Sequence, residues 1–314
     1  MSPRHSTTAL ALAAAILLVA GCADNSVNPK TQSTNEQALV TGTLAAEPQF
    51  LEDGFMDAGA TTNLAPTLRG ARGAAGVSGT TGAAIDPFFF WRQIDHRTLT
   101  FEFAFADTDT TGLPRTAFVT ARRTFSGTFN IVPRDPAHPD LPDTAHVTHK
   151  LLLDHWVRYF HLKRVDMPGM SRPMWKMAGA SAIEVTAENA TSLITSVRVQ
   201  TATLDTTLTD PSVLIPLRRV LRFSPEDTVT ITVTTPRNDD VVLLYHHDRR
   251  ERLTNNGDGT YSGTFRAGLF SGWRHFAVNA LSHETLYDDA AAYDSKAWIY
   301  PYVIVGGPYV DYLP

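Results

Sequence analysis

Four histidines in one apolar-rich stretch are the first residues of this chain whose types and spacing suggest metal chemistry. They are His146, His149, His155 and His161. On a strand the last three share a face, but each six-residue step spans about 20 Å, which is too far for one ion. His146 and His149 could chelate only on a helix or turn, and Asp154 alone does not complete a ligand set. We therefore predict exposed or hydrogen-bonded strand histidines and no metal site.

Two further clusters contain the residue types of a hydrolase. His246 and His247 are adjacent, so on a strand they point to opposite faces and cannot share an ion. Ser282, His283 and Glu284 follow one another near the C-terminal end. The chain has neither a G-x-S-x-G nor an H-E-x-x-H motif. We predict no catalytic residue, no metal ligand and no cofactor, and keep an extracytoplasmic hydrolase as an alternative function.

Acidic turns are the remaining candidates for ion binding. Asp107 and Asp109 form one, and Asn255, Asn256 and Asp258 form another. Neither turn carries the bidentate Glu or the loop spacing of a calcium hand. We predict ordinary turns at both places.

An aromatic row near the C-terminal end supplies the candidate ligand-binding residues, Trp298, Tyr300 and Tyr302. Alternate residues of a strand lie on one face, about 7 Å apart. If this row is exposed, it could stack on sugar rings or hold a peptide, which makes carbohydrate binding an alternative function. If it is buried, it fills a core or a seam between sheets, because Trp and Tyr often occupy such seams. The buried arrangement is the one we favour.

Most of the chain has the pattern of β-strands. Residues 98–106 alternate apolar and polar side chains, with Leu99 and three phenylalanines on one face. Gly127 interrupts a later strand as a possible bulge. The expected strands are 98–106, two within 116–132, one or two within 146–165, 174–186, 192–207, 227–235, 240–248 and 297–305. A helix is the weaker alternative over 146–165. Turn signals every 8–12 residues suggest a sandwich or related all-β fold.

The segment 256–278 carries a more specific signal. It contains Asn-Gly and Asp-Gly turns, which supply the positive φ of tight turns, followed by Tyr261 and by Phe265, Gly272, Phe276 and Val278. This arrangement resembles filamin-type and other immunoglobulin-like repeats. The resemblance implies a β-sandwich over about 225–305, and Tyr261 as the buried phenol that ties a corner together.

The N-terminus contains the only cysteine, Cys22, after an apolar run at residues 9–20 and a basic Arg4. The run is too short to span a bilayer and fits a secretory signal. Residues 19–22, Val-Ala-Gly-Cys, resemble the lipobox of bacterial lipoproteins. That resemblance implies a signal peptide at 1–21, cleavage before Cys22 and acylation of this cysteine. Ala23 in place of aspartate favours the outer membrane over the inner membrane.

Composition limits the partners. Loss of residues 1–21 removes Arg4 and no acidic residue, so the formal net charge changes from −5 to −6. A mildly acidic chain without a basic stripe argues against nucleic acid as a partner.

Residues 23–84 are poor in aromatic side chains and rich in small and polar ones, which predicts a disordered, flexible tether.

These observations predict an all-β protein with tandem β-sandwich domains after a disordered tether. The expected divisions are a signal peptide (1–21), a lipidated N-terminus and tether (22–85), an N-terminal β-domain (86–222), an immunoglobulin-like sandwich (223–306) and a tail (307–314). A single larger sandwich is the alternative architecture. The expected function is that of a non-enzymatic, lipid-anchored protein of the bacterial cell envelope. Its expected partners are the membrane, through Cys22, and an envelope protein or polysaccharide.

Overall fold

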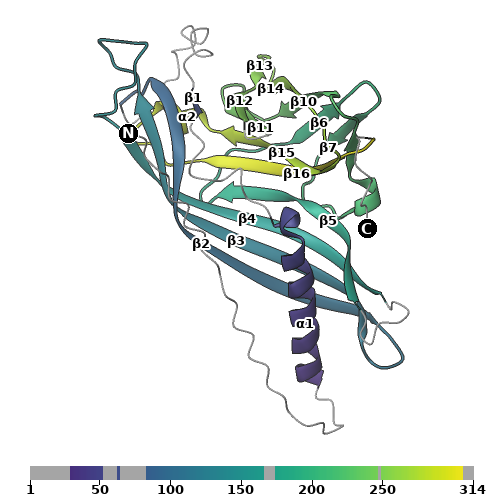
Figure 1. Cartoon of the computed structure of the whole chain (residues 1–314). Coiled ribbons are helices and arrows are strands. Elements are labelled where there is room, and N and C mark those ends of the chain that lie inside the picture. The colour runs from purple at the N-terminus through teal and green to yellow at the C-terminus, as the bar shows by residue number, and fades with distance from the viewer. Residues whose placement is uncertain (1–28, 52–61, 64–82, 166–173, 247–248, 307–314) are drawn as a thin grey trace, which may run out of the picture.

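The computed structural model describes residues 29–51, 62–63, 83–165, 174–246 and 249–306 (Figure 1). Its helices are α1 (Pro29–Ala46), η1 (Pro48–Phe50), η4 (Leu217–Arg219) and α2 (His283–Tyr287). Its strands are β1 (Thr62–Asn63), β2 (Pro87–Thr108), β3 (Pro114–Pro133), β4 (Thr148–Val165), β5 (Met174–Ala187), β6 (Ser196–Gln200), β7 (Asp205–Leu208), β8 (Ile215–Pro216), β9 (Leu221–Phe223), β10 (Thr228–Thr234), β11 (Val241–His246), β12 (Arg249–Arg252), β13 (Thr254–Asn255), β14 (Thr260–Arg266), β15 (Gly272–Leu281) and β16 (Ser295–Ile304). The predicted all-β class is confirmed, since strands make up most of the described residues and the helices are a minor part.

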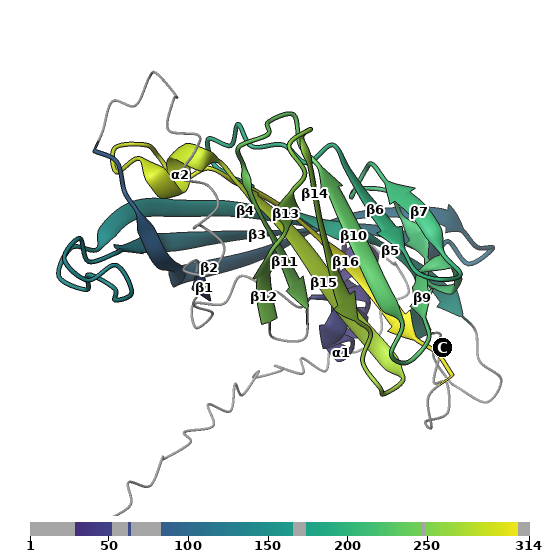
Figure 2. The same ribbon diagram turned by 90° about the horizontal axis from the view of Figure 1, so that it is seen from above.

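Two sheets form a sandwich-like arrangement. The larger has the order β1-β2-β3-β4-β5-β16-β15-β11-β12, with β8 paired to β5 and β9 to β16. The smaller has the order β13-β14-β10-β6-β7. The strands pair antiparallel, apart from the parallel pair β9–β16. Viewed from above, the smaller sheet lies over β11, β15 and β16 (Figure 2).

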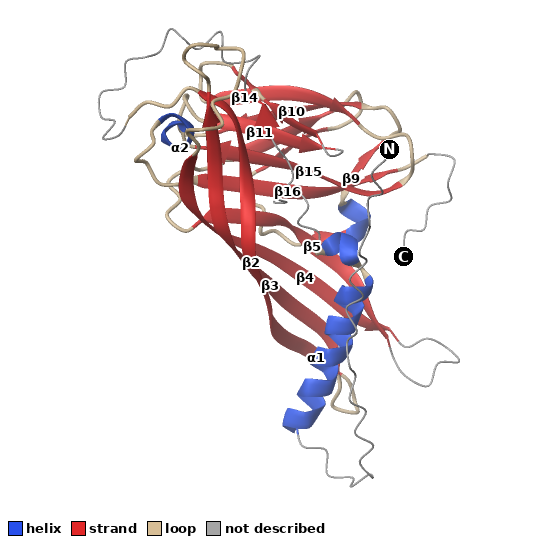
Figure 3. Ribbon diagram, turned by 60° about the vertical axis from the view of Figure 1, so that its left-hand side comes forward, coloured by secondary structure: helices blue, strands red, loops and turns tan. Residues whose placement is uncertain are grey.

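The larger sheet curls until strands from its two ends meet. Arg92 on β2 donates hydrogen bonds to Tyr245 on β11 and to Asn279 on β15. Arg250 on β12 lies over the ring of Phe90 on β2, 5.2 Å from its centroid. Because β2 and β12 stand near opposite ends of the strand order, these contacts require a strongly curved sheet, as Figure 3 shows. The curl encloses the first hydrophobic core on the concave face.

Four strands of the larger sheet have both faces buried. On β16, Ala297 and Ile299 belong to the core of the concave face, whereas Trp298 and Tyr300 belong to a second core between the two sheets. The strands β5, β11 and β15 divide their side chains between the two cores in the same way. This explains the nearly continuous apolar run of β11, Val-Val-Leu-Leu-Tyr, because a strand covered on both faces does not alternate.

The hydrogen bonding does not divide at the expected domain boundary. β5 (Met174–Ala187) pairs with β16 (Ser295–Ile304), and β6 (Ser196–Gln200) pairs with β10 (Thr228–Thr234). Strands from both sides of residue 223 thus complete both sheets. Pairing between distant strands leaves no local mark in the sequence, and the division into domains at 86–222 and 223–306 stays a prediction.

The expected tether at 22–85 contains ordered elements. Val40 and Leu44 of α1 lie four residues apart and are buried in the first core, together with Phe50 of η1. α1 lies along the far ends of the long strands (Figure 3). The sequence did not predict this helix, because the segment has too few apolar residues to show a helical pattern and only a few positions of α1 are buried. Among the described residues, no helix has the length and apolar character needed to cross a bilayer.

Candidate functional site

The aromatic row predicted as a candidate binding surface is buried. Trp298, Tyr300 and Tyr302 are 3%, 1% and 0% exposed. They point into the core between the sheets, where Tyr302 packs against Phe223 with ring centroids 4.9 Å apart. The smaller sheet covers this face of β16, so the three rings cannot form a platform for a sugar or peptide. The favoured buried arrangement is the correct one.

The histidines of β4 take separate partners. The Nδ1 atom of His149 lies 2.6 Å from the Asn130 side-chain oxygen, His155 pairs with Glu188, and His161 stacks on Phe118. The strand expected over 146–165 is a single strand, β4, and it holds these rings apart as predicted. Within the described residues, no group of three or more His, Cys, Asp or Glu side chains could hold a metal ion.

The hydroxyl group in the Ser-His-Glu cluster has a structural role. Ser282 caps α2, and its Oγ accepts a hydrogen bond from the backbone N–H of Thr285 at 3.2 Å. The ring of His283 stacks on Tyr287, with centroids 4.3 Å apart. His247, the second member of the other histidine pair, lies outside the described residues. Cys22 and the segments 1–21 and 307–314 also lie outside them.

The acidic turns and the tyrosine corner form as expected. The side chain of Asp109 accepts hydrogen bonds from the Thr111 hydroxyl and from the backbone N–H groups of Thr111 and Leu113, and these bonds lower the pKa of the carboxyl. Gly257 and Gly259 adopt φ values of +85° and +81° in the turns before β14. Tyr261 is buried and donates a hydrogen bond to the Arg237 carbonyl oxygen at 3.2 Å.

The concave face of the larger sheet carries a feature that the sequence analysis missed, a series of inward-facing arginines. They are Arg92 and Arg97 on β2, Arg123 on β3, Arg158 on β4 and Arg250 on β12. A usable signal was present, because Arg97 has the strand parity of Leu99, which was assigned to an apolar face. A charged residue with the parity of an apolar face is informative because such a face is expected to be apolar, and Arg97 itself is exposed.

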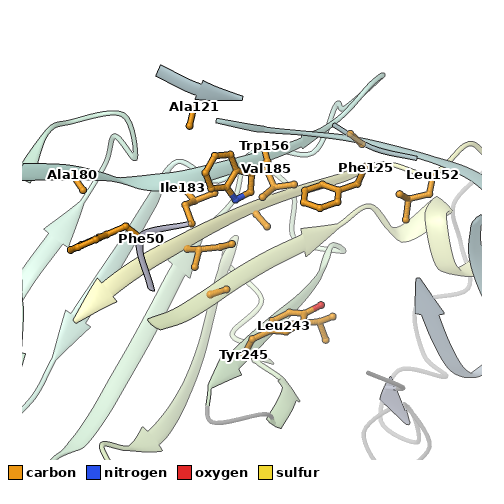
Figure 4. Close-up of a cluster of buried hydrophobic side chains, with 14 of the residues drawn as sticks. Phe50, Ala121, Phe125, Leu152, Trp156, Ala180, Ile183, Val185, Leu243 and Tyr245 are labelled. Atoms are coloured by element: carbon orange, nitrogen blue, oxygen red, sulfur yellow. The ribbon is translucent and has the colours of Figure 1, made fainter. Parts of the chain in front are cut away.

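One of these arginines belongs to a buried polar network that closes the curl. The Arg92 guanidinium donates to Tyr293 at 3.1 Å, Tyr245 at 3.3 Å and Asn279 at 2.8 Å. Tyr293 in turn donates to Asp154 at 3.1 Å. Burial raises the pKa of Asp154 to about 6, and the positive charge of Arg92 opposes that rise. Figure 4 shows Tyr245 and Leu243 across the core from Trp156 and Leu152.

Arg158 is buried without a carboxylate among the described residues. Its guanidinium donates to the carbonyl oxygens of Phe50 at 2.7 Å and Ser181 at 3.1 Å, and its Nη2 has no hydrogen-bond partner in the described part of the chain. Burial lowers its pKa to about 9. The pKa of the nearby His275 falls to about 3, first through burial and second through the charge of Arg158. The interior is therefore electropositive at this point.

A groove with a volume of about 520 Å³ opens on the concave face where η1 meets β2 and β3. Its lining is Ala45, Pro48, Leu51, Arg97, Thr98, Leu99 and Arg123. Arg97 lies over the Phe125 ring at 5.9 Å and Arg123 over the Trp156 ring at 5.2 Å. Apolar walls and two guanidinium groups thus share one concavity, which we take as the candidate binding site.

A second concavity lies among the loops at 235–239 and 257–259. Its only arginine, Arg237, already pairs with Asp294 at 3.5 Å and Glu284 at 3.6 Å. The carbonyl oxygen of the same residue accepts the Tyr261 hydroxyl. These contacts give Arg237 a structural role, because they hold the loops together.

The comparisons with known proteins add no relative: no family model, no curated protein and no solved structure matches this chain.

Proposed function

We propose that this chain is a lipid-anchored protein of the bacterial cell envelope that acts by binding. The proposal combines the lipobox-like residues 19–22 with the position of α1, which carries the structural part of the argument. The helix begins at Pro29, seven residues after Cys22. Seven residues reach at most about 25 Å when fully extended. An acylated Cys22 would therefore hold the start of the helix close to the bilayer surface.

The docking of α1 makes that proximity relevant to the whole fold. Glu36 and Val40 of the helix are buried against the larger sheet, and the chain continues through η1 into the wall of the groove. The groove lies at the other end of α1, about 25 Å from Pro29 at 1.5 Å per residue, which suits a protein whose ligand or partner lies near the membrane. An envelope protein or polysaccharide remains the proposed partner class for the exposed loops, without the aromatic row of β16. The outer membrane is the proposed location.

Acylation can be measured directly. The full chain is expressed in a Gram-negative host with an alkyne-tagged palmitate, and membrane fractions are separated by density. We expect label and membrane association for the wild type, and loss of both for Cys22→Ser. Ala23→Asp serves as a sorting control that should retain the label but move the protein to the inner membrane. An unlabelled wild type in the soluble fraction would refute the anchor.

A further inference from the structure

We propose that the larger sheet carries a membrane-contact patch, which binds the surface of a bilayer that contains anionic phospholipid. The proposal deepens the envelope function proposed above and rests on that function for its biological setting. The patch lies at the far end of the long strands, on the convex face of the sheet. Its residues are Phe118 on β3, His161, Lys163 and Val165 on β4, and Met174 and Lys176 on β5.

The strand register places the patch residues side by side. Val165 stands directly opposite Met174, and Lys163 stands directly opposite Lys176. Residues that are directly opposite share a face and lie about 5 Å apart. Trp175, between the two patch residues of β5, is buried in the first core. Because neighbouring residues of a strand point to opposite faces, the patch lies on the other, convex face.

The apolar residues of the patch are exposed. Phe118 is 41% exposed, Met174 is 42% exposed and Val165 is 36% exposed. The Phe118 ring stacks on the ring of His161, with centroids 4.8 Å apart, which fixes it on the surface of the sheet. Single exposed apolar residues are ordinary, but several grouped on one face mark a surface that contacts a protein or a membrane.

The charges of the patch favour an anionic surface. Lys163 and Lys176 are both exposed, and like charges directly opposite each other destabilise a sheet. The acidic residues at the β2–β3 turn, Asp107 and Asp109, already have partners within the fold. Lipid phosphates would relieve the repulsion between the lysines. Long lysine side chains can also lay their apolar stems along a membrane interface while their ammonium groups stay in water.

The patch lies at the end of the fold that is nearest the proposed anchor. Trp175, flanked by patch residues, donates a hydrogen bond to Glu36 of α1. Glu36 lies seven residues after Pro29, which is about 10 Å along the helix. Figure 3 shows α1 beside the ends of the long strands. A chain held through Cys22 would therefore bring this end close to lipid, which favours a bilayer as the occupant of the patch.

The test is co-sedimentation with vesicles of phosphatidylcholine, prepared with and without phosphatidylglycerol. It uses residues 22–314 with Cys22→Ser, a chain that contains every described residue and cannot be acylated. We expect at least tenfold tighter binding to the vesicles with phosphatidylglycerol, and weaker binding as salt is raised. Equal binding to both vesicles, or binding to neither, would overturn the proposal. Because acylation is measured separately, failure here leaves the anchor untouched.

Charge reversal locates the contact. Lys163→Glu with Lys176→Glu should weaken binding to the anionic vesicles at least tenfold. The matched control, Arg198→Glu with Arg266→Glu, makes the same change in net charge at two exposed positions of the smaller sheet and should weaken binding less than threefold. Equal losses in the two proteins would show that net charge alone governs binding, which contradicts the patch.

A fluorescent label locates the apolar part of the contact. Cys22 is the only cysteine, so Met174→Cys in the Cys22→Ser chain carries a single environment-sensitive fluorophore. Its emission should shift to shorter wavelength on anionic vesicles, whereas a label at the exposed Thr264→Cys should not shift. This result does not depend on the folding of the lysine variant. An unshifted label at position 174 would contradict the contact.

Other occupants give different results in the same experiments. An anionic polysaccharide would bind through charge alone, so dextran sulfate would bind as tightly as the anionic vesicles. A second copy of the chain would produce a dimer without vesicles, and the lysine variant would change its stability. Either result would overturn the assignment of the patch to lipid.

Discussion

The indole N–H of Trp175 on β5 donates a 2.8 Å hydrogen bond to the Glu36 carboxylate on α1, across 139 residues of sequence. Both side chains are buried, and Trp175 also contacts the ring of Phe105. This bond joins the segment that follows Cys22 to the far end of the long strands. The N-terminal helix is thereby part of the folded unit.

Glu36→Ala is expected to loosen α1. The substitution removes the acceptor and leaves a buried indole N–H unpaired, which should lower the free energy of unfolding by about 1–3 kcal/mol. Hydrogen exchange should rise across residues 34–46. Asn35→Ala, at an exposed neighbouring position, is the control and should neither lower the free energy of unfolding nor raise hydrogen exchange. Equal protection of α1 in both variants would argue against this attachment.

Gly42→Ala is expected to stabilise the protein. Gly42 lies inside α1 and a Cβ atom there meets no atom within 4 Å. Alanine in an open helical position is favoured over glycine by about 0.5–1 kcal/mol. Denaturant unfolding of the two proteins measures the gain. If residues 29–46 were a flexible tether, the substitution would have no effect.

The Arg92–Asp154 network is expected to show strong coupling. Arg92→Met removes the cation that the Tyr293 hydroxyl links to the buried Asp154, and the loss of one partner of a buried charge pair costs up to about 3–5 kcal/mol. Adding Asp154→Asn should restore part of that loss, because it removes the carboxylate that Arg92→Met leaves uncompensated. The penalty of Arg92→Met should be smaller at pH 5 than at pH 7.5, since the carboxyl is then protonated. Additive effects in a double-mutant cycle would contradict the network.

His275 is expected to contribute to acid sensitivity. Its pKa is lowered to about 3 in the fold, against about 6.5 when unfolded. The unfolded state therefore binds the proton first, and stability falls as pH decreases from about 6.5 towards 3. Between pH 7 and pH 5 this amounts to about 2 kcal/mol. His275→Gln should lose that much less stability over the same interval, by chemical denaturation.

The contribution of Asp154 to stability changes with pH in the opposite direction from that of His275, so the comparison of variants must separate the two. The pKa of this carboxyl is raised to about 6, so its contribution to stability decreases as pH rises from about 4 to 6. The difference between wild type and His275→Gln cancels that contribution. If the free energy of unfolding depends on pH in the same way in both proteins, His275 does not contribute to the acid sensitivity.

The aromatic row of β16 is expected to affect stability. Trp298→Ala should cost about 3–5 kcal/mol, because it opens a cavity between the sheets. Tyr300→Phe should be neutral or stabilising by up to about 1 kcal/mol, since the buried hydroxyl has no hydrogen-bond partner among the described residues. Thermal unfolding measures both. A stable Trp298→Ala variant with altered polysaccharide binding would restore the surface interpretation.

Local patterns predicted much of this molecule. Alternation identified the strand at 98–106 within β2, and Gly127 marked the point where β2 changes register between Ile94 and His96. At that position a Cβ atom would lie 1.9 Å from the Gln93 carbonyl oxygen, so only glycine fits. The Asn-Gly and Asp-Gly turns and the Tyr261 corner also followed from the sequence. Each depends on neighbours within a few residues or on a single recognisable motif.

The tertiary structure decided which faces are covered and which distant strands meet. No sequence pattern near Trp298 indicates that the smaller sheet covers its side of β16. Likewise, no pattern near Arg97 indicates that η1, from the N-terminal segment, packs nearby. The pairing of β5 with β16 and the docking of Glu36 onto Trp175 join segments more than 100 residues apart. A strand's period assigns its side chains to two faces, but only the curl of the sheet determines what each face meets. The sequence by itself thus determined the strands and turns, whereas closure of the curved sheet decided the shared core and the arginine-lined groove.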